Sequence, residues 1–139
     1  MVYDNNNGGE YGKYFVQNSP GPAMDAEFKA IYDQFAKRIL WMDGNVCPGA
    51  FQMNTAWYFN AAPRDPMFTE HEHGDTNELV CFFSSDPDNP YDLGGKIEFS
   101  IEGEPHLLTK STMICKIKTK IITIYPTTRL MNIITQKFL

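Results

Sequence analysis

The sequence predicts a mainly β fold, either a sandwich or a small barrel, with one helix near the N-terminus. Short segments rich in aromatic or alternating apolar residues recur from residue 51 onward. Clusters of Gly, Pro, Asn and Asp separate these segments at the spacing of turns. Only one earlier stretch has apolar residues at three- and four-residue intervals. The length of 139 residues suits a single domain.

The helix is expected between Met24 and Leu40. Its apolar positions are Met24, Phe28, Ile31, Tyr32, Phe35, Ile39 and Leu40. Pro22 stands near its start and basic residues stand near its end, as the helix dipole favours, and Asp43-Gly44 ends it. The apolar stripe indicates a face that packs on a sheet. Before the helix, the segment Lys13–Gln17 predicts a short first strand.

The strands of the β region follow from apolar alternation and turn residues. We expect strands at Phe51–Phe59, Glu78–Phe83 and Lys96–Ile101. The last of these alternates strictly, which predicts one buried and one solvated face. Loops are expected at Ala61–Pro66 and Ser84–Gly95, and the chain turns after Ile101 to return from His106.

Charge is distributed unevenly along the chain. The net charge is −5, which argues against a nucleic-acid partner. Residues 1–104 carry six Lys/Arg and all seventeen Asp/Glu, a net of −11, whereas residues 105–139 carry six Lys/Arg and no acid. The C-terminal segment is therefore a basic tail of different composition.

The cysteines and the lack of targeting segments predict a cytoplasmic protein. Cys47, Cys81 and Cys115 are odd in number and form no CxxC, so neither a disulfide framework nor a thiolate zinc site is expected. The N-terminus lacks the plan of a signal peptide. No apolar run approaches the roughly 18 residues that cross a bilayer, so no membrane partner is expected.

Two of the three histidines, His71 and His73, stand two residues apart. On an extended segment, such residues point to the same face. The turn-like tetrad Gly74–Asn77 can reverse the chain and bring Glu78 back beside them. Two imidazoles and a carboxylate form the facial triad that binds Fe(II), and they also suit Mn or Zn. The pattern predicts a site for one divalent transition metal at His71, His73 and Glu78.

A second interpretation of the same segment is an exposed acidic loop. Glu70, Glu72 and Asp75 make the segment strongly acidic, and a histidine pair on such a loop need not bind metal. On a strand, Glu72 points away from the two histidines. The spacing alone leaves both interpretations open.

The pattern His71-x-His73-x4-Glu78, followed by Gly94-Gly95 and the strand Lys96–Ile101, resembles the first motif of the cupin superfamily. More broadly, residues 11–114 are similar to an uncharacterised bacterial cupin-like family. The resemblance implies a cupin-like double-stranded β-helix, or jelly-roll barrel. It also implies that the two histidines and the glutamate are metal ligands inside the barrel, and that the protein pairs as a homodimer.

The chain departs from the cupin pattern after residue 111. The second motif, a Pro-x-Gly turn followed by a histidine, is absent from Thr112 onward, and His106 is interpreted as a rim residue. One account is a natural cupin with three protein ligands and water on the metal. The other is that residues from 115 onward come from a shifted reading frame, which leaves the barrel incomplete at the C-terminus.

These observations predict three segments and a general function. The segments are a flexible stretch over 1–22, a cupin-like domain with its leading helix over 23–114, and an atypical basic tail over 115–139 that can form a strand. The function is metal binding with a small-molecule ligand, and whether the protein is an enzyme stays open. The alternatives are a non-catalytic cupin module that binds a small molecule or sugar, and a truncated inactive cupin. Trp57, Tyr58 and Phe99 are candidate liners of the cavity.

Overall fold

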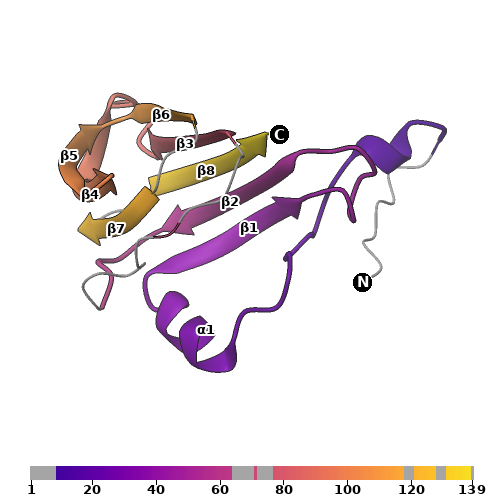
Figure 1. The fold of residues 1–139 in the computed structure, drawn as a ribbon, viewed down its shortest axis with the longest axis horizontal. Coiled ribbons are helices and arrows are strands. Elements are labelled where there is room, and N and C mark those ends of the chain that lie inside the picture. Colours follow the sequence, from indigo (N-terminus) through magenta and orange to yellow (C-terminus); the bar gives the residue numbers. More distant parts are fainter. Residues whose placement is uncertain (1–8, 64–70, 72–76, 118–120, 128–130, 139) are drawn as a thin grey trace.

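The structure is a computed structural model that describes residues 9–63, 71, 77–117, 121–127 and 131–138. Its elements are the 3-10 helix η1 (Gly12–Tyr14), the helix α1 (Ala26–Tyr32), and the strands β1 (Ala36–Met42), β2 (Gln52–Tyr58), β3 (Asn77–Ser84), β4 (Asp92–Ile101), β5 (Glu104–Lys110), β6 (Thr112–Ile117), β7 (Ile121–Thr127) and β8 (Met131–Phe138). The fold is mainly β with one α-helix, as the sequence predicts (Figure 1).

The strands form two antiparallel sheets. The larger sheet has the order β1-β2-β8-β3-β6, and the smaller sheet has the order β5-β4-β7. Phe82 of β3 and Phe99 of β4 meet edge to face between the sheets, with ring centroids 6.0 Å apart. This geometry is favourable for an aromatic pair and joins the two layers through the core.

The core draws on α1, both sheets and the segment that joins α1 to β1. Its buried members are Tyr32, Phe35, Ala36, Ala56, Tyr58, Val80, Phe82, Leu93, Ile97 and Phe99. Removing these apolar side chains from water is the main favourable contribution to folding. In the part of the chain described, no helix combines the length and apolar character that a bilayer crossing requires.

Three of the predicted strands are confirmed as β2, β3 and β4. In β4, Ile97 and Phe99 are buried while Lys96 and Glu98 are more exposed, as strict alternation predicts. The turn to β5 is a two-residue loop, in which Glu102 has a φ of 50° and Gly103 a φ of 79°. Two positive φ values match the twist of the flanking strands.

The predicted helix is correct only in its first half. Asp25 caps α1 by accepting hydrogen bonds from the backbone N–H of Glu27 at 2.9 Å and of Phe28 at 3.1 Å. The helix ends at Tyr32, and the strand β1 begins at Ala36. The expectation of a helix to Leu40 was wrong, because the apolar run Ile39–Met42 also suits a strand and pairs with β2. Pairing with β2 then decides the conformation, since tertiary contacts override weak helix propensity.

The predicted strand Lys13–Gln17 is also wrong. Residues 12–14 form η1, where backbone N–H groups bond to carbonyls three residues back, such as Phe15 to Gly12 at 3.1 Å. Phe15 is 56% exposed, and no sheet among the described strands includes this segment. A lone strand without a neighbour leaves its backbone groups unpaired, so the local turn is favoured.

The division of the chain into residues 1–22, 23–114 and 115–139 stays a prediction. The structure describes contacts in the first and the last of these segments. Ser19 is fully buried; its carbonyl accepts from the backbone N–H of Trp41 at 2.9 Å, and its hydroxyl donates to the carbonyl of Trp41. At the other end, residues 112–138 supply β6, β7 and β8. The basic tail therefore contributes strands to both sheets.

Candidate metal centre

Glu78 lies on the inner face of the larger sheet. Side chains alternate along a strand, so Glu78 shares a face of β3 with Val80 and Phe82. Val80 and Phe82 belong to the core, with 3% and 0% of their surface exposed, and Glu78 itself is only 4% exposed. The predicted carboxylate ligand therefore points between the two sheets.

The inner face of the larger sheet becomes polar near Glu78. Gln52 and Asn54 share the face of β2 that carries the buried Ala56, because they lie four and two residues away from it. The register through β8 places Glu78 level with Gln52, and Val80 level with Asn54. A carboxylate and two amides therefore occupy one end of this face.

The opposite end of the same face is apolar and is covered by α1. There the register through β8 places Phe82 level with Ala56. The ring of Tyr32 in α1 lies 6.5 Å from the ring of Tyr58 at the end of β2. Figure 1 shows α1 at the start of β1, far from the C-terminal end of β8 that flanks Glu78. The polar end is thus the end that α1 does not close.

A carboxylate in such a position requires compensation of its charge. Moving an ionised group out of water costs several kcal/mol unless a cation or hydrogen-bond donors replace the water. A metal ion with imidazole and carboxylate ligands is one source of this compensation. In the backbone register, the residues paired with Glu78 are Lys116 of β6 and Lys137 of β8.

The two histidines of the predicted site are placed only in part. His71 forms a single-residue β bridge and is exposed, so it lies toward solvent rather than in the core. His73 lies outside the described residues. Among the residues that are described, no group of three or more His, Cys, Asp or Glu is arranged to hold a metal. The convergence of His71, His73 and Glu78 therefore stays a prediction.

Asn54 is a polar residue of this region that the sequence analysis missed. Its Oδ1 atom is buried and accepts no hydrogen bond from any residue the structure describes. An amide oxygen in this state is available to a ligand hydroxyl, an ordered water or a hard cation. The signal for it was the period of two in β2, which places Asn54 in line with Ala56 and Tyr58.

Two of the three candidate cavity liners are buried in the core. Tyr58 is 5% exposed and Phe99 is 1% exposed. Trp57 adjoins Tyr58 on β2 and so points to the opposite face of the sheet, which excludes it from the same cavity. Burial raises the pKa of Tyr58 well above its ordinary value, with a further contribution from Tyr32. Tyr58 therefore stays protonated at neutral pH and is no candidate for a general base.

His106 occupies the exposed position expected of a rim residue. It lies on β5, and 45% of its side chain is exposed. Its Nε2 atom is 3.6 Å from Oε1 of Glu104, which is more exposed still. His106 therefore belongs to the hairpin end of the smaller sheet.

Comparison with solved structures relates this arrangement of sheets to known proteins. The chain matches a predicted oxalate decarboxylase from Thermotoga maritima with a TM-score of 0.51 and 9% identity, over 75% of this chain and 81% of that one. It matches a cupin protein from Bacteroides fragilis with a TM-score of 0.51 and 11% identity, over 88% and 85%. It matches a sugar phosphate isomerase of the cupin superfamily from Silicibacter pomeroyi with a TM-score of 0.50 and 10% identity, over 86% and 70%.

The chain has the cupin fold. No protein-family model matches the sequence, and no curated protein matches it. At 9–11% identity, the likeness to these cupins concerns the fold alone.

Proposed function

We propose that this cupin-fold protein binds one divalent transition metal, Fe, Mn or Zn, through His71, His73 and Glu78. The observation that supports the proposal is the placement of Glu78. Its carboxylate is 4% exposed, on the inner face of the larger sheet, at the end that α1 leaves open. A buried carboxylate beside the half-buried amides of Gln52 and Asn54 is a poor core residue and a good ligand residue.

The donor set fits such an ion. Imidazole is neutral and carboxylate is ionised near pH 7, so both types of ligand are ready to bind without large changes of protonation. Three protein ligands leave coordination positions for water or a substrate. When bound, the metal would supply Lewis acidity or oxygen activation toward a small anionic or carbonyl substrate. The amides of Gln52 and Asn54 would then orient that molecule by hydrogen bonds.

A second candidate function is non-catalytic binding of a small molecule or sugar in the same interior. It is favoured by Asn54, whose buried Oδ1 atom suits a hydroxyl group of a ligand. The two functions differ in whether the isolated protein contains metal.

Metal content of the purified protein tests the proposal. We expect close to one equivalent of a single transition metal by elemental analysis. The variants His73→Ala and Glu78→Gln should each lose most of it, because removal of one of three ligands weakens binding strongly. The variant His106→Ala is the matched control and should keep the metal, since it removes a histidine that lies on β5 and is exposed.

Metal that stays bound in His73→Ala would show that the site is wrong. A wild-type protein without metal, which also takes up none when metal salts are added, would favour the non-catalytic module or the truncated inactive cupin. Sequencing the gene distinguishes the truncated inactive cupin from the non-catalytic module. A Pro-x-Gly-x-x-His in another frame beyond codon 114 would support the shifted frame and hence the truncated cupin. We also propose a cytoplasmic location, which the three free cysteines support, and a homodimer.

A further inference from the structure

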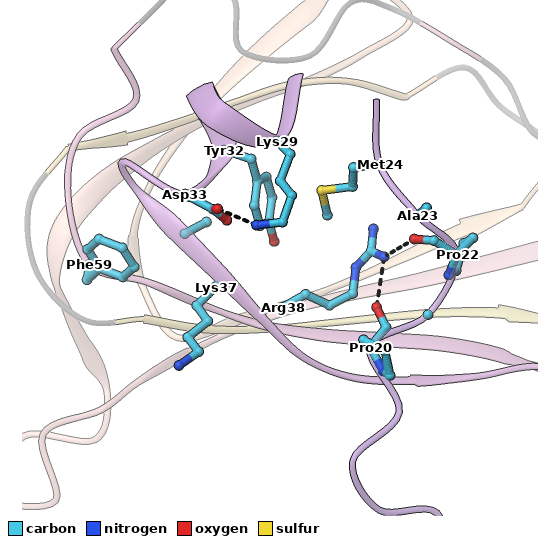
Figure 2. A pocket seen from close by; sticks show the side chains of 12 residues that line it. Pro20, Pro22, Ala23, Met24, Lys29, Tyr32, Asp33, Lys37, Arg38 and Phe59 are labelled. Carbon is cyan, nitrogen blue, oxygen red and sulfur yellow. Dashed lines mark hydrogen bonds and ion pairs between the residues drawn. The ribbon is translucent and has the colours of Figure 1, made fainter. Parts of the chain in front are cut away.

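A cavity lies beside β1, an edge strand of the larger sheet, next to α1. It is lined by residues 20–24, α1, the start of β1 and Phe59 (Figure 2), and its volume is about 620 Å³. This volume falls in the range of pockets for small organic ligands, about 300–1,000 Å³. The cavity is separate from Glu78, which lies toward the other end of the larger sheet.

Arg38 is the polar centre of this cavity, and its position is fixed. Its Nη1 atom donates to the carbonyl oxygen of Pro20 at 3.1 Å and to that of Pro22 at 3.0 Å. Its guanidinium carbon lies 5.2 Å from the centre of the Trp41 ring, a cation–π distance. Figure 2 shows the guanidinium between the 20–22 backbone and Met24. These contacts hold the guanidinium at the wall of the cavity.

The edge of the guanidinium formed by Nε and Nη2 carries further hydrogen-bond donors. The two bonds of Nη1 leave the N–H groups of Nε and Nη2, which together form one side of the planar fork. The Nε atom is buried and finds no acceptor within the described part of the chain. An unpaired buried donor on a charged group is costly, and a carboxylate satisfies such an edge with two parallel hydrogen bonds. Because Nε has almost no exposed surface, binding requires a small movement of the side chains around it.

The charges around the cavity favour a monoanion. Lys29 forms an ion pair with Asp33 at the rim, so these two charges offset each other. The side chain of Lys37 extends away from Arg38 in Figure 2. Within the described residues, Arg38 and Lys37 are the lining cations without a carboxylate partner, while Met24 and Phe59 provide apolar surface.

We propose that this cavity binds a small organic monocarboxylate. Arg38 takes the carboxylate through the edge formed by Nε and Nη2, and the apolar body lies against Met24 and Phe59. The Arg38 site does not depend on the proposed metal centre, because none of its lining residues belongs to that centre.

Titration with hexanoate, followed by two-dimensional amide NMR of the full chain, tests this proposal. Hexanoate should shift the amide signals of residues 21, 23, 24, 29–38 and 59 in a saturable manner. Hexanamide, its uncharged isostere, should bind at least about tenfold more weakly than hexanoate, because it lacks the charge that strengthens the bonds to Arg38. Equal binding of the two compounds, or shifts confined to residues far from this cavity, would overturn the proposal.

Variants separate the role of Arg38 from a general effect of charge. Arg38→Gln should weaken hexanoate binding about tenfold or more, whereas Lys110→Gln removes a positive charge on β5 and should leave the binding unchanged. Arg38 also holds residues 20–22, so its variant is first checked by circular dichroism. If it does not fold, Ala23→Phe decides, because a larger side chain at this exposed lining position should block hexanoate. If Ala23→Phe and a folded Arg38→Gln both bind hexanoate as well as the wild-type protein does, the proposed site is wrong.

Discussion

Gly21 lets the N-terminal segment pack against β1. Its φ is +74°, a conformation that residues with a side chain rarely adopt. A Cβ atom at this position would lie 2.7 Å from Cβ and from Cγ of Trp41. Trp41 is held in turn, because its Nε1 donates to Oδ2 of Asp43 at 2.9 Å and its ring lies beside Arg38. A single missing side chain therefore permits the packing that forms one wall of the Arg38 cavity.

We expect Gly21→Ala to lower the free energy of unfolding more than Gly49→Ala does. Gly49 has a φ of +83°, but a Cβ atom added there would meet nothing within 4 Å, so its variant has only the backbone strain, about 1–2 kcal/mol. Gly21→Ala adds the overlap with Trp41, about 1–3 kcal/mol more. Urea unfolding followed by circular dichroism measures both. Equal losses would mean that the 20–22 segment does not pack on Trp41 in solution.

At the scale of elements, the two neighbouring strands β3 and β6 place their cysteines differently. Cys81 in β3 is 4% exposed, and burial raises the pKa of its thiol. Cys115 in β6, which pairs with Leu79 of β3, is exposed. The difference follows from position: β3 has a partner on both sides, whereas β6 is an edge of the sheet.

We therefore expect iodoacetamide at pH 8 to modify Cys115 well before Cys81. The thiolate is the reactive form, and both the raised pKa and the burial reduce the reactive fraction of Cys81. Peptide mass spectrometry against time measures the two rates, and urea-unfolded protein, in which both thiols should react alike, is the control. Rapid modification of Cys81 in the folded protein would show that β6 and β8 do not cover β3.

At the scale of the whole molecule, the C-terminal residues hold the sheets together. β8 lies between β2 and β3 and pairs with both, so it joins the two halves of the larger sheet. β7 pairs with β4 in the smaller sheet. The segment whose composition departs most from the rest of the chain thus occupies a central structural position.

A chain that ends at residue 130 should lose its cooperative unfolding transition. Without β8, the backbone groups of β2 and β3 that bond to it have no partners, and the exposed strand edges favour aggregation. Calorimetry and size-exclusion chromatography measure the effect. Deletion of residues 1–10, within the segment predicted to be flexible, is the control and should preserve the transition. A folded, monomeric 1–130 chain would contradict the central position of β8.

The sequence by itself determined the elements whose pattern allows one interpretation. The strict alternation of Lys96–Ile101 permits only a half-buried strand, and the Glu102–Gly103 turn follows it as expected. The start of α1 could also be predicted from the sequence, because Asp25 and Pro22 are local signals of a helix N-terminus. The choice of Glu78 as a ligand rested on the turn-like tetrad Gly74–Asn77 and on the resemblance to the first cupin motif, and the burial of Glu78 agrees with an inward carboxylate.

Only the tertiary structure decided the elements whose pattern allows two interpretations. The apolar residues of Ala36–Met42 suit either a helix or a strand, and pairing with β2 selected the strand. The insertion of β8 between β2 and β3 joins residues far apart in the chain, such as Gln52 and Lys137, which no local signal can specify. The Arg38 cavity is likewise formed by segments that meet only on folding. Local sequence sets the preferences of each segment, whereas long-range backbone pairing and burial select among them because they involve more free energy than the local preference does.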